Sequence, residues 1–159
     1  ETADELLHRL FKESGPLLTK AIEKIQDPLF QPTEQNEEEK TICRKIAKTD
    51  GLIDWEDCTK NIYNRFRAFY PWPGSYSYFD HAAISFEEIR PIFEAVDLSL
   101  TKPGQFAYDR RNKKLFAKTK DGYLEIIKLK PAGKKLLDAA SFWNGIQSKK
   151  DLVHEFHNS

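Results

Sequence analysis

From residue 75 onward, the sequence alternates apolar and polar side chains in five short segments, a period of two that is typical of half-buried β-strands. The segments cover residues 76–79, 84–96, 105–108, 115–119 and 123–130, although Pro91 interrupts the second one. Lys120-Asp121-Gly122 separates the last two segments and suits a tight hairpin, because glycine tolerates a positive φ. Short strands joined by close turns predict a small β-barrel.

Helical periodicity precedes this β region. Apolar residues recur at steps of three and four in residues 3–11 and 17–25, with Gly15 and Pro16 between the two runs. Glycine can end a helix and proline suits the first turn of the next, so we predict two amphipathic helices. Residues 27–40 hold prolines and a run of glutamates but few large apolar residues, and they are predicted to form an extended linker.

A third helix is predicted to begin after Asp54, a favourable N-cap residue, and to end before Pro71. Its apolar face consists of residues at helical spacing, namely Trp55, Cys58, Ile62, Phe66 and Phe69. The next residues, Pro71-Trp72-Pro73-Gly74, predict a rigid corner in which the Trp72 indole packs on this helix. A less favoured alternative is base stacking by exposed aromatic side chains, here Trp72, Tyr76, Tyr78 and Phe79.

A short final helix is predicted after Asp138, with Asn144-Gly145 at its end. His154 and His157 follow it near the last residue. We expect an exposed histidine pair rather than a zinc site, because no cysteine or further histidine stands at ligand spacing.

The sequence contains no pattern that predicts catalysis or metal binding by this chain. It has no serine in a GxSxG motif and no glycine-rich phosphate loop after a strand. Cys43 and Cys58 are predicted to be reduced and structural. No apolar run approaches the roughly 18 residues of a membrane span. The sequence also lacks methionine and opens on an acidic helical segment, so we expect it to be a piece of a longer protein.

The formal net charge of zero conceals a strong asymmetry along the chain. Residues 1–40 carry 5 basic and 10 acidic side chains, or −5, whereas residues 41–159 carry 20 and 15, or +5. Residues 102–135 alone carry 11 basic and 3 acidic side chains, or +8. Such a concentration of positive charge favours a polyanionic partner, although a solvated lysine-rich face is the simpler alternative.

The candidate RNA-binding side chains are the basic residues of this block after residue 109, together with one arginine of the predicted third helix. Residues two apart in a strand point to one face, so Lys118 with Lys120, and Lys128 with Lys130, are expected to be displayed together, while Ile127 and Leu129 face the core. The arginines of the third helix fit a structural ion pair equally well. The full candidate set is Arg67, Arg110, Arg111, Lys113, Lys114, Lys118, Lys120, Lys128, Lys130, Lys134 and Lys135.

Several motifs in a consistent order resemble one protein family. Residues 50–55 read DGLIDW, residues 67–76 read RAFYPWPGSY, residues 129–135 read LKPAGKK and residues 141–145 read SFWNG. Together they resemble the C-terminal portion of the methionyl-tRNA formyltransferases. The resemblance implies a mainly β fold with flanking α-helices, in which an OB-like small β-barrel follows amphipathic helices left from the catalytic domain.

The resemblance also implies a division of the chain and a role for it. Residues 1–26 are expected to be the terminal helices of a missing Rossmann-type catalytic domain, residues 27–40 a linker, and residues 41–159 the OB-like domain. The parent enzyme of this family transfers formyl from 10-formyltetrahydrofolate, its co-substrate, to the amino group of methionyl initiator tRNA. The family's catalytic residues lie upstream, so this part is expected to hold tRNA, to bind no cofactor and to be inactive alone.

Two alternatives remain open at this stage. The chain could be the C-terminal module of a related formyltransferase acting on an amino-sugar nucleotide or a folate, or a nucleic-acid-binding module without an enzyme. We expect a cytoplasmic, monomeric protein with no membrane partner.

Overall fold

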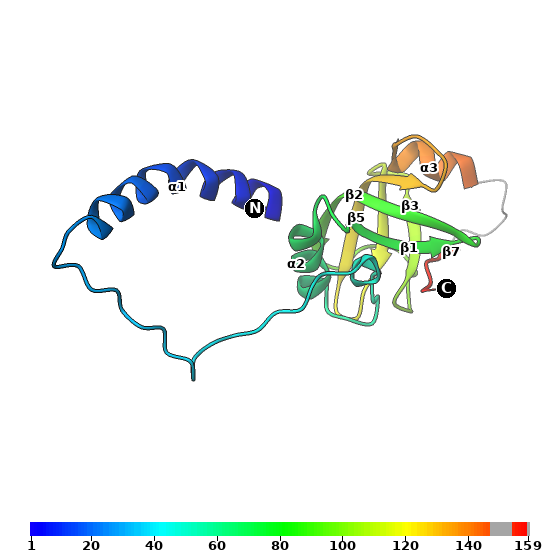
Figure 1. Ribbon diagram of the computed structural model, residues 1–159. Helices are drawn as coiled ribbons and strands as arrows, with labels where there is room; N and C mark the ends of the chain where they lie inside the picture. Colours follow the sequence, from blue (N-terminus) through cyan, green and yellow to red (C-terminus); the bar gives the residue numbers. More distant parts are fainter. Residues whose placement is uncertain (147–153, 159) are drawn as a thin grey trace. The chain divides into compact units, whose positions relative to one another are not determined.

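The computed structural model describes residues 1–146 and 154–158, which form two compact units, Glu1–Ile46 and Ala47–Ser159 (Figure 1). The first unit contains helix α1, Ala3–Ile25, followed by turns and extended chain. The second unit contains the sheet and the other helices. None of the described helices is both long enough and apolar enough to cross a membrane.

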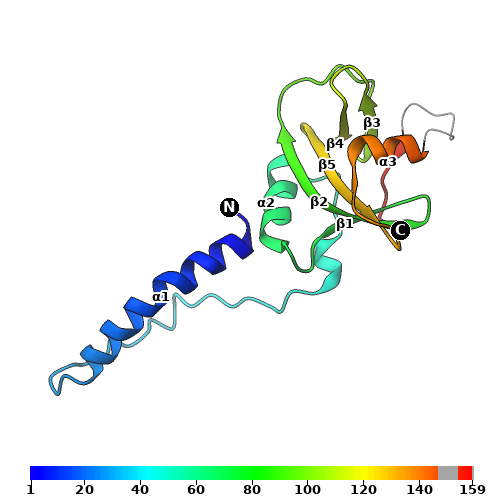
Figure 2. The same ribbon diagram turned by 90° about the horizontal axis from the view of Figure 1, so that it is seen from above.

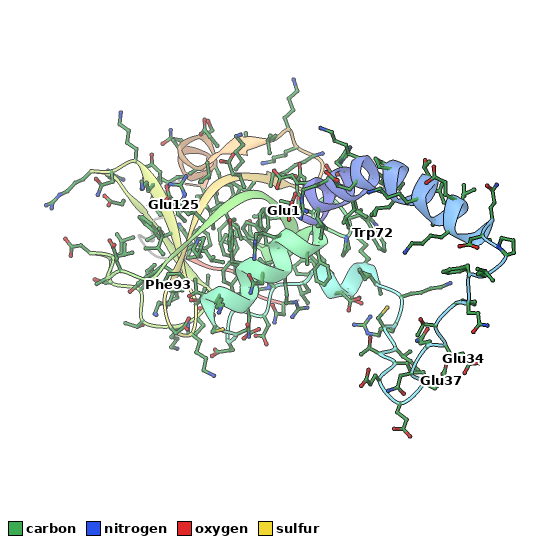
Figure 3. The ribbon with its side chains drawn as sticks, turned by 90° about the vertical axis from the view of Figure 1, so that its left-hand side faces the viewer. Glu1, Glu34, Glu37, Trp72, Phe93 and Glu125 are labelled. Atoms are coloured by element: carbon green, nitrogen blue, oxygen red, sulfur yellow. The ribbon has the colours of Figure 1, made fainter. Side chains whose placement is uncertain are left out.

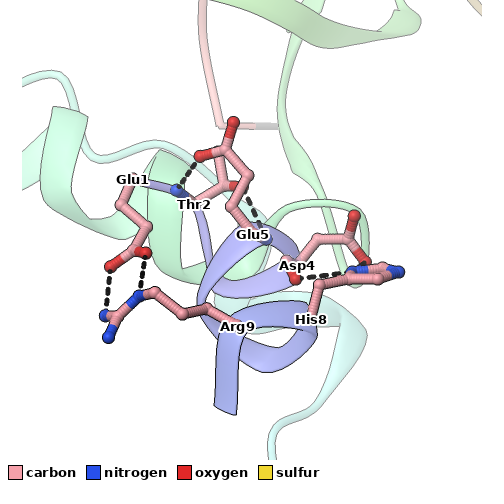
Figure 4. A network of polar contacts seen from close by, with 6 residues as sticks. All are labelled: Glu1, Thr2, Asp4, Glu5, His8 and Arg9. Atoms are coloured by element: carbon pink, nitrogen blue, oxygen red, sulfur yellow. Dashed lines mark hydrogen bonds and ion pairs between the residues drawn. The ribbon is translucent and has the colours of Figure 1, made fainter. Parts of the chain in front are cut away.

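Helix α1 is continuous, so the prediction of two separate helices was wrong. Gly15 does not adopt the positive φ that ends a helix, and Pro16 lies inside the helix. The backbone bond that proline removes is tolerated here because this helix is exposed and water can satisfy the free carbonyl. Thr2 caps the start: its hydroxyl accepts from the Glu5 amide, and the Glu5 carboxylate accepts from the Thr2 amide (Figure 4).

The second unit is built on a single antiparallel sheet, as the alternating pattern predicts (Figures 1 and 2). The strand order is β1-β2-β5-β4-β3-β7, and β6 pairs with β5. A further bridge joins Tyr78 of β1 to His157, just after β7, and brings the two ends of the sheet together into a nearly closed barrel. The strands are β1 Ser75–Phe79, β2 Ala82–Ile92, β3 Gln105–Asp109, β4 Lys114–Lys118, β5 Tyr123–Pro131, β6 Leu137–Asp138 and β7 His154–Glu155.

All five predicted strands are present, with two differences. The second strand ends at Ile92 rather than at Val96. On β5, the register shifts between Ile126, which pairs with Ile89, and Lys128, which pairs with Glu88. This irregularity moves the buried side from the even to the odd positions, so Leu129 is buried as predicted but Ile127 is only half-buried.

The barrel core is rich in aromatic side chains, some of which come from the last residues of the chain. Phe156 is 2% exposed and stacks on Phe106, with ring centroids 4.0 Å apart. His154 is also buried, against the rings of Phe79 and Trp143. The prediction of an exposed histidine pair was therefore wrong, because β7 pairs with β3 and carries His154 into the core.

Helix α2, Thr59–Phe69, packs against β1 and β2 (Figure 2). It begins later than predicted. Cys58 occupies the N-cap position without a side-chain cap, and the Asp121 carboxylate of the β4–β5 hairpin accepts instead from the Thr59 amide, at 2.8 Å. Asp54 accepts from the Glu56 amide in a preceding turn, and Trp55 enters the core rather than the helix face.

The Pro-Trp-Pro-Gly segment forms the predicted corner, but its tryptophan faces solvent. Trp72 is 61% exposed, so the expected packing of its indole on α2 was wrong. Instead, Tyr70 lies beside Phe66, with ring centroids 6.5 Å apart. The corner also packs backbone to backbone on the 3₁₀ helix η1, Lys48–Gly51, because Gly51 lies against Gly74.

The final helix, α3, spans Ala139–Ile146 and packs against β3, β4, β5 and β6 (Figure 1). Asp138 caps it as predicted, accepting from the Ser141 amide at 2.7 Å, and this bond lowers the pKa of the Asp138 carboxyl. The helix ends at Ile146, one residue after the predicted Asn144-Gly145.

Candidate nucleic-acid interface

The β3–β4 hairpin displays three of the predicted basic residues. Arg110, Arg111 and Lys113 are all exposed, and Lys113 adopts a positive φ of 56° in the turn. Asp109 organises this turn: its carboxylate accepts from the amides of Arg111 and Asn112 and from the Asn112 side chain, at 2.9, 3.1 and 2.7 Å. These bonds, that from the Asn112 side chain foremost, lower the pKa of Asp109. A tightly bonded carboxylate holds the turn, and the cationic side chains extend into solvent.

Lys114 belongs to a different environment, although it adjoins these residues in the sequence. Its ammonium lies 3.2 Å from one oxygen of Glu125, and Arg90 lies 3.7 Å from the other. The Glu125 side chain, labelled in Figure 3, is only 8% exposed. A nearly buried carboxylate requires a positive partner. The charges of Lys114 and Arg90 therefore stabilise the fold by pairing with Glu125 rather than being available to a ligand.

Two more predicted lysines are engaged within the sheet. Lys128 pairs with Glu88 at 2.7 Å, and that hydrogen bond raises the pKa of Lys128. Lys118 lies over the Tyr123 ring, with its ammonium 4.7 Å from the ring centroid, and donates to the Gly122 carbonyl at 3.3 Å. Lys118 is half-buried, whereas Lys128 is exposed but paired with a similarly exposed carboxylate.

Arg67 is also structural rather than displayed. It is half-buried on α2, donates to the Asn64 side chain at 2.6 Å, and lies over the Tyr63 ring. Its neighbour Arg65 donates to the Asp50 carbonyl at 2.8 Å. Arg67 therefore contacts two side chains of its own helix, and Arg65 holds α2 to η1 through a backbone carbonyl.

Strand register divides the remaining candidates into two places. Leu115 of β4 pairs with Ile126 of β5, so β5 runs past the β3–β4 hairpin and continues to Pro131. The β3–β4 hairpin and the turn after β5 therefore leave the sheet at the same end. The exposed candidates at this end are Arg110, Arg111, Lys113, Lys130, Lys134 and Lys135, whereas Lys120 lies at the opposite end, in the β4–β5 hairpin.

We refer to those six residues as the basic end of the barrel. Six of the predicted basic side chains are thus exposed towards this end, while Lys114, Lys118, Lys128 and Arg67 contact other residues of the protein. Arg90 was not predicted, and no local pattern in the sequence indicates it, since its partner Glu125 stands on another strand. Among the described residues, no group of three or more histidine, cysteine, aspartate or glutamate side chains could hold a metal ion.

Comparison with known proteins places this fold in a family. The model of the family described as formyl transferase, C-terminal domain, matches residues 45–147. A methionyl-tRNA formyltransferase of Solibacter usitatus is 30% identical over 145 residues, covering 91% of this chain and 45% of that protein. One of Treponema denticola is 30% identical over 148 residues, covering 91% and 46%. The chain thus spans a little under half the length of these relatives.

Solved structures agree at the level of the fold. HypX from Aquifex aeolicus in complex with tetrahydrofolic acid has a TM-score of 0.57 at 22% identity, covering 83% of this chain and 23% of HypX. A multiply substituted variant of HypX gives a TM-score of 0.58, also at 22% identity. The family match covers most of the barrel unit, from the approach to η1 to the end of α3. This chain therefore belongs to the formyl transferase C-terminal domain family.

Proposed function

We propose that this chain is the tRNA-holding part of a methionyl-tRNA formyltransferase. In this proposal the whole enzyme works in the cytoplasm as a monomer and transfers formyl from 10-formyltetrahydrofolate to the amino group of methionyl initiator tRNA. The family match and the names of the relatives support this choice of enzyme. The chain corresponds to less than half of those relatives, so the reaction is assigned to another part of the enzyme, and this part alone is expected to be inactive.

The observation that carries the tRNA role is the basic end of the barrel. Its six side chains are exposed, whereas the other basic residues of the block after residue 109, apart from Lys120, are bound to carboxylates or rings. Exposed cations can neutralise phosphates and release the counterions bound to RNA, which favours association. Contacts of this kind fix the position of a nucleic acid without reading its sequence.

The proposed mechanism is positional. By holding the tRNA backbone, the basic end keeps the aminoacyl end of the tRNA near the catalytic domain, which lowers the entropic cost of bringing the two substrates together. The chain contributes orientation and affinity, and the formyl transfer itself uses residues outside it.

The test measures binding of methionyl initiator tRNA between about 50 and 200 mM salt, a range in which phosphate contacts weaken steeply. The variant R110A/R111A/K113A removes three exposed charges from the hairpin. Each lost phosphate contact lowers the slope of log affinity against log salt by roughly 0.7 to 0.9, so we expect a decrease of about 2 to 2.7 for the triple variant.

The matched control is K12A/K20A/K24A, which removes the same total charge from exposed positions of α1. It should leave the slope nearly unchanged, because it alters net charge without touching the basic end. If the two triple variants change the slope equally, or if binding is insensitive to salt, the proposed tRNA role is wrong.

A further inference from the structure

The outer face of the sheet carries a second feature, formed by β1, β2 and β5. On β1, Ser75 and Ser77 are buried and Tyr76 and Tyr78 point outward, with their rings 6.0 Å apart. Strand register places Tyr76 opposite Ser85 of β2, and Ser85 opposite Lys130 of β5. Two tyrosines of β1, a serine of β2 and a lysine of β5 thus lie on three neighbouring strands.

The next pair of residues along β1 and β2 also places a small side chain beside a tyrosine. Tyr78 pairs with Ala83, and the Ala132 amide donates to the Ala83 carbonyl at 2.8 Å. Small side chains therefore form the floor between the tyrosines and the chain after Lys130. The result is a groove with a volume of about 480 Å³, which is within the range of roughly 300 to 1,000 Å³ that is usual for ligand pockets. We call it the β1–β2–β5 groove.

The charges at the groove favour an anion. Lys130 lines one side, and Lys48 of η1 lines the rim near Tyr76. Glu87 is the one carboxylate among the lining residues, and it accepts from the Ser85 hydroxyl at 3.2 Å. Two lysines against one glutamate leave a positive site beside two aromatic rings.

The edge of β1 is not open to another strand. The Tyr76 carbonyl accepts from the Ile53 amide at 2.9 Å, and Tyr78 exchanges two backbone hydrogen bonds with His157, both at 2.9 Å. A peptide therefore cannot extend the sheet at these positions by backbone pairing. The side chains of the groove therefore have to recognise the ligand. The two tyrosine rings favour a ligand with a flat ring, and the two lysines favour a ligand with negative charge.

We infer that the β1–β2–β5 groove binds an unpaired nucleotide of RNA, with its base against Tyr76 or Tyr78 and its phosphate near Lys48 or Lys130. This inference rests on the proposed function, since it names a second contact of the same RNA. An unpaired base can expose its face to an aromatic side chain, whereas a base inside a duplex is already stacked. Tyr76 and Lys130 stand two strands apart, about 10 Å, a span on the scale of one nucleotide.

The test measures fluorescence anisotropy of a labelled single-stranded RNA hexamer and of the same RNA as a duplex, with the whole chain. Tyr78→Ala should weaken single-strand binding by about 5- to 100-fold, because base stacking on an aromatic side chain contributes that much per base. Tyr78→Phe keeps the ring and should stay within about twofold. Tyr70→Ala, an aromatic control outside the groove, should also stay within about twofold.

A second variant protects the test from a loss of folding. Ser85 points outward and is half-buried, so Ser85→Ile fills part of the groove with an aliphatic side chain without entering the core, and it should weaken single-strand binding at least about fivefold. The inference is overturned if Tyr78→Ala and Ser85→Ile both bind the hexamer like the unchanged chain, or if the duplex binds as tightly. Binding of a proline-rich peptide by a chain that ignores the hexamer would likewise overturn it.

The two proposals fail in distinguishable ways. If the hairpin variant R110A/R111A/K113A lowers the salt dependence of tRNA binding while the groove variants have no effect, only the groove assignment is wrong. If the chain binds neither tRNA nor the hexamer, both assignments are wrong.

Discussion

Replacement of Gly51 by alanine tests whether residues 50–55 and residues 67–76 are joined by backbone packing. Gly51 is buried, and a Cβ atom added there would collide with the Gly74 carbonyl oxygen. It would also approach the Gly74 carbonyl carbon at 3.2 Å and the Tyr76 ring at 3.4 Å. The colliding atom belongs to the backbone, so no rotation of a side chain can relieve the overlap. Helix η1 and the corner would have to move apart.

The expected cost follows from this geometry. Overpacking a rigid site costs typically 1 to 3 kcal/mol, and an overlap with backbone belongs at the upper end, about 3 kcal/mol. Separation of η1 from the corner also threatens the bond from the Ile53 amide to the Tyr76 carbonyl, which contributes about 1 kcal/mol. For a domain of roughly 100 residues, 3 kcal/mol corresponds to a decrease in Tm of about 12 to 24 °C.

Urea denaturation followed by tryptophan fluorescence measures this loss. Trp55 reports on the core, because it is 4% exposed and stacks on Phe156 with ring centroids 5.4 Å apart. The matched control is Gly145→Ala in α3, where a Cβ meets no heavy atom within 4 Å. This control should be neutral or stabilising by up to about 1 kcal/mol, because alanine favours a helix over glycine. If Gly51→Ala unfolds within about 0.5 kcal/mol of the unchanged chain, the packing argument is refuted.

Two further predictions concern buried and exposed side chains of the same unit. Thr59→Val removes the hydrogen bond that the Thr59 hydroxyl donates to Asp121, at 2.8 Å, and the bond between the Thr59 and Thr119 hydroxyls, at 2.6 Å. It should lower Tm at pH 7 by about 4 to 8 °C in a thermal melt. Two bonds from Thr59 lower the pKa of Asp121, that of the backbone amide foremost and that of the hydroxyl next, and the substitution removes only the second. The stabilisation by the hydroxyl bond is present above the unfolded pKa of about 3.9 and is lost as pH falls through the folded pKa, so a Tm deficit that grows in acid contradicts this account. Trp72→Ala should change the free energy of unfolding by less than about 0.5 kcal/mol, measured with urea, because the indole is 61% exposed, whereas an indole packed on α2 would cost about 3 to 5 kcal/mol.

The sequence predicts the parts of this fold that depend on local periodicity. Alternation with a period of two locates all five main strands, and helical spacing locates the residues of α1, although as two helices, and most of α2. The cap residue Asp138 locates the start of α3. Errors occur where a distant segment supplies the decisive contact. Asp54 is a favourable cap by sequence, yet Asp121, 62 residues from Thr59, supplies the bond at the start of α2.

The candidate interface likewise combines features that the sequence determines with features that the tertiary structure decides. The sequence by itself determines that positive charge is concentrated between residues 102 and 135 and that the chain contains motifs resembling the family, because composition and short motifs depend only on neighbouring residues. The tertiary structure decided which of those charges are displayed. Lys113 and Lys114 are adjacent and chemically identical, but strand register places only Lys114 beside the nearly buried Glu125. Burial of a carboxylate demands a positive partner, and long-range strand pairing determines which cation meets that demand and which remains exposed to solvent.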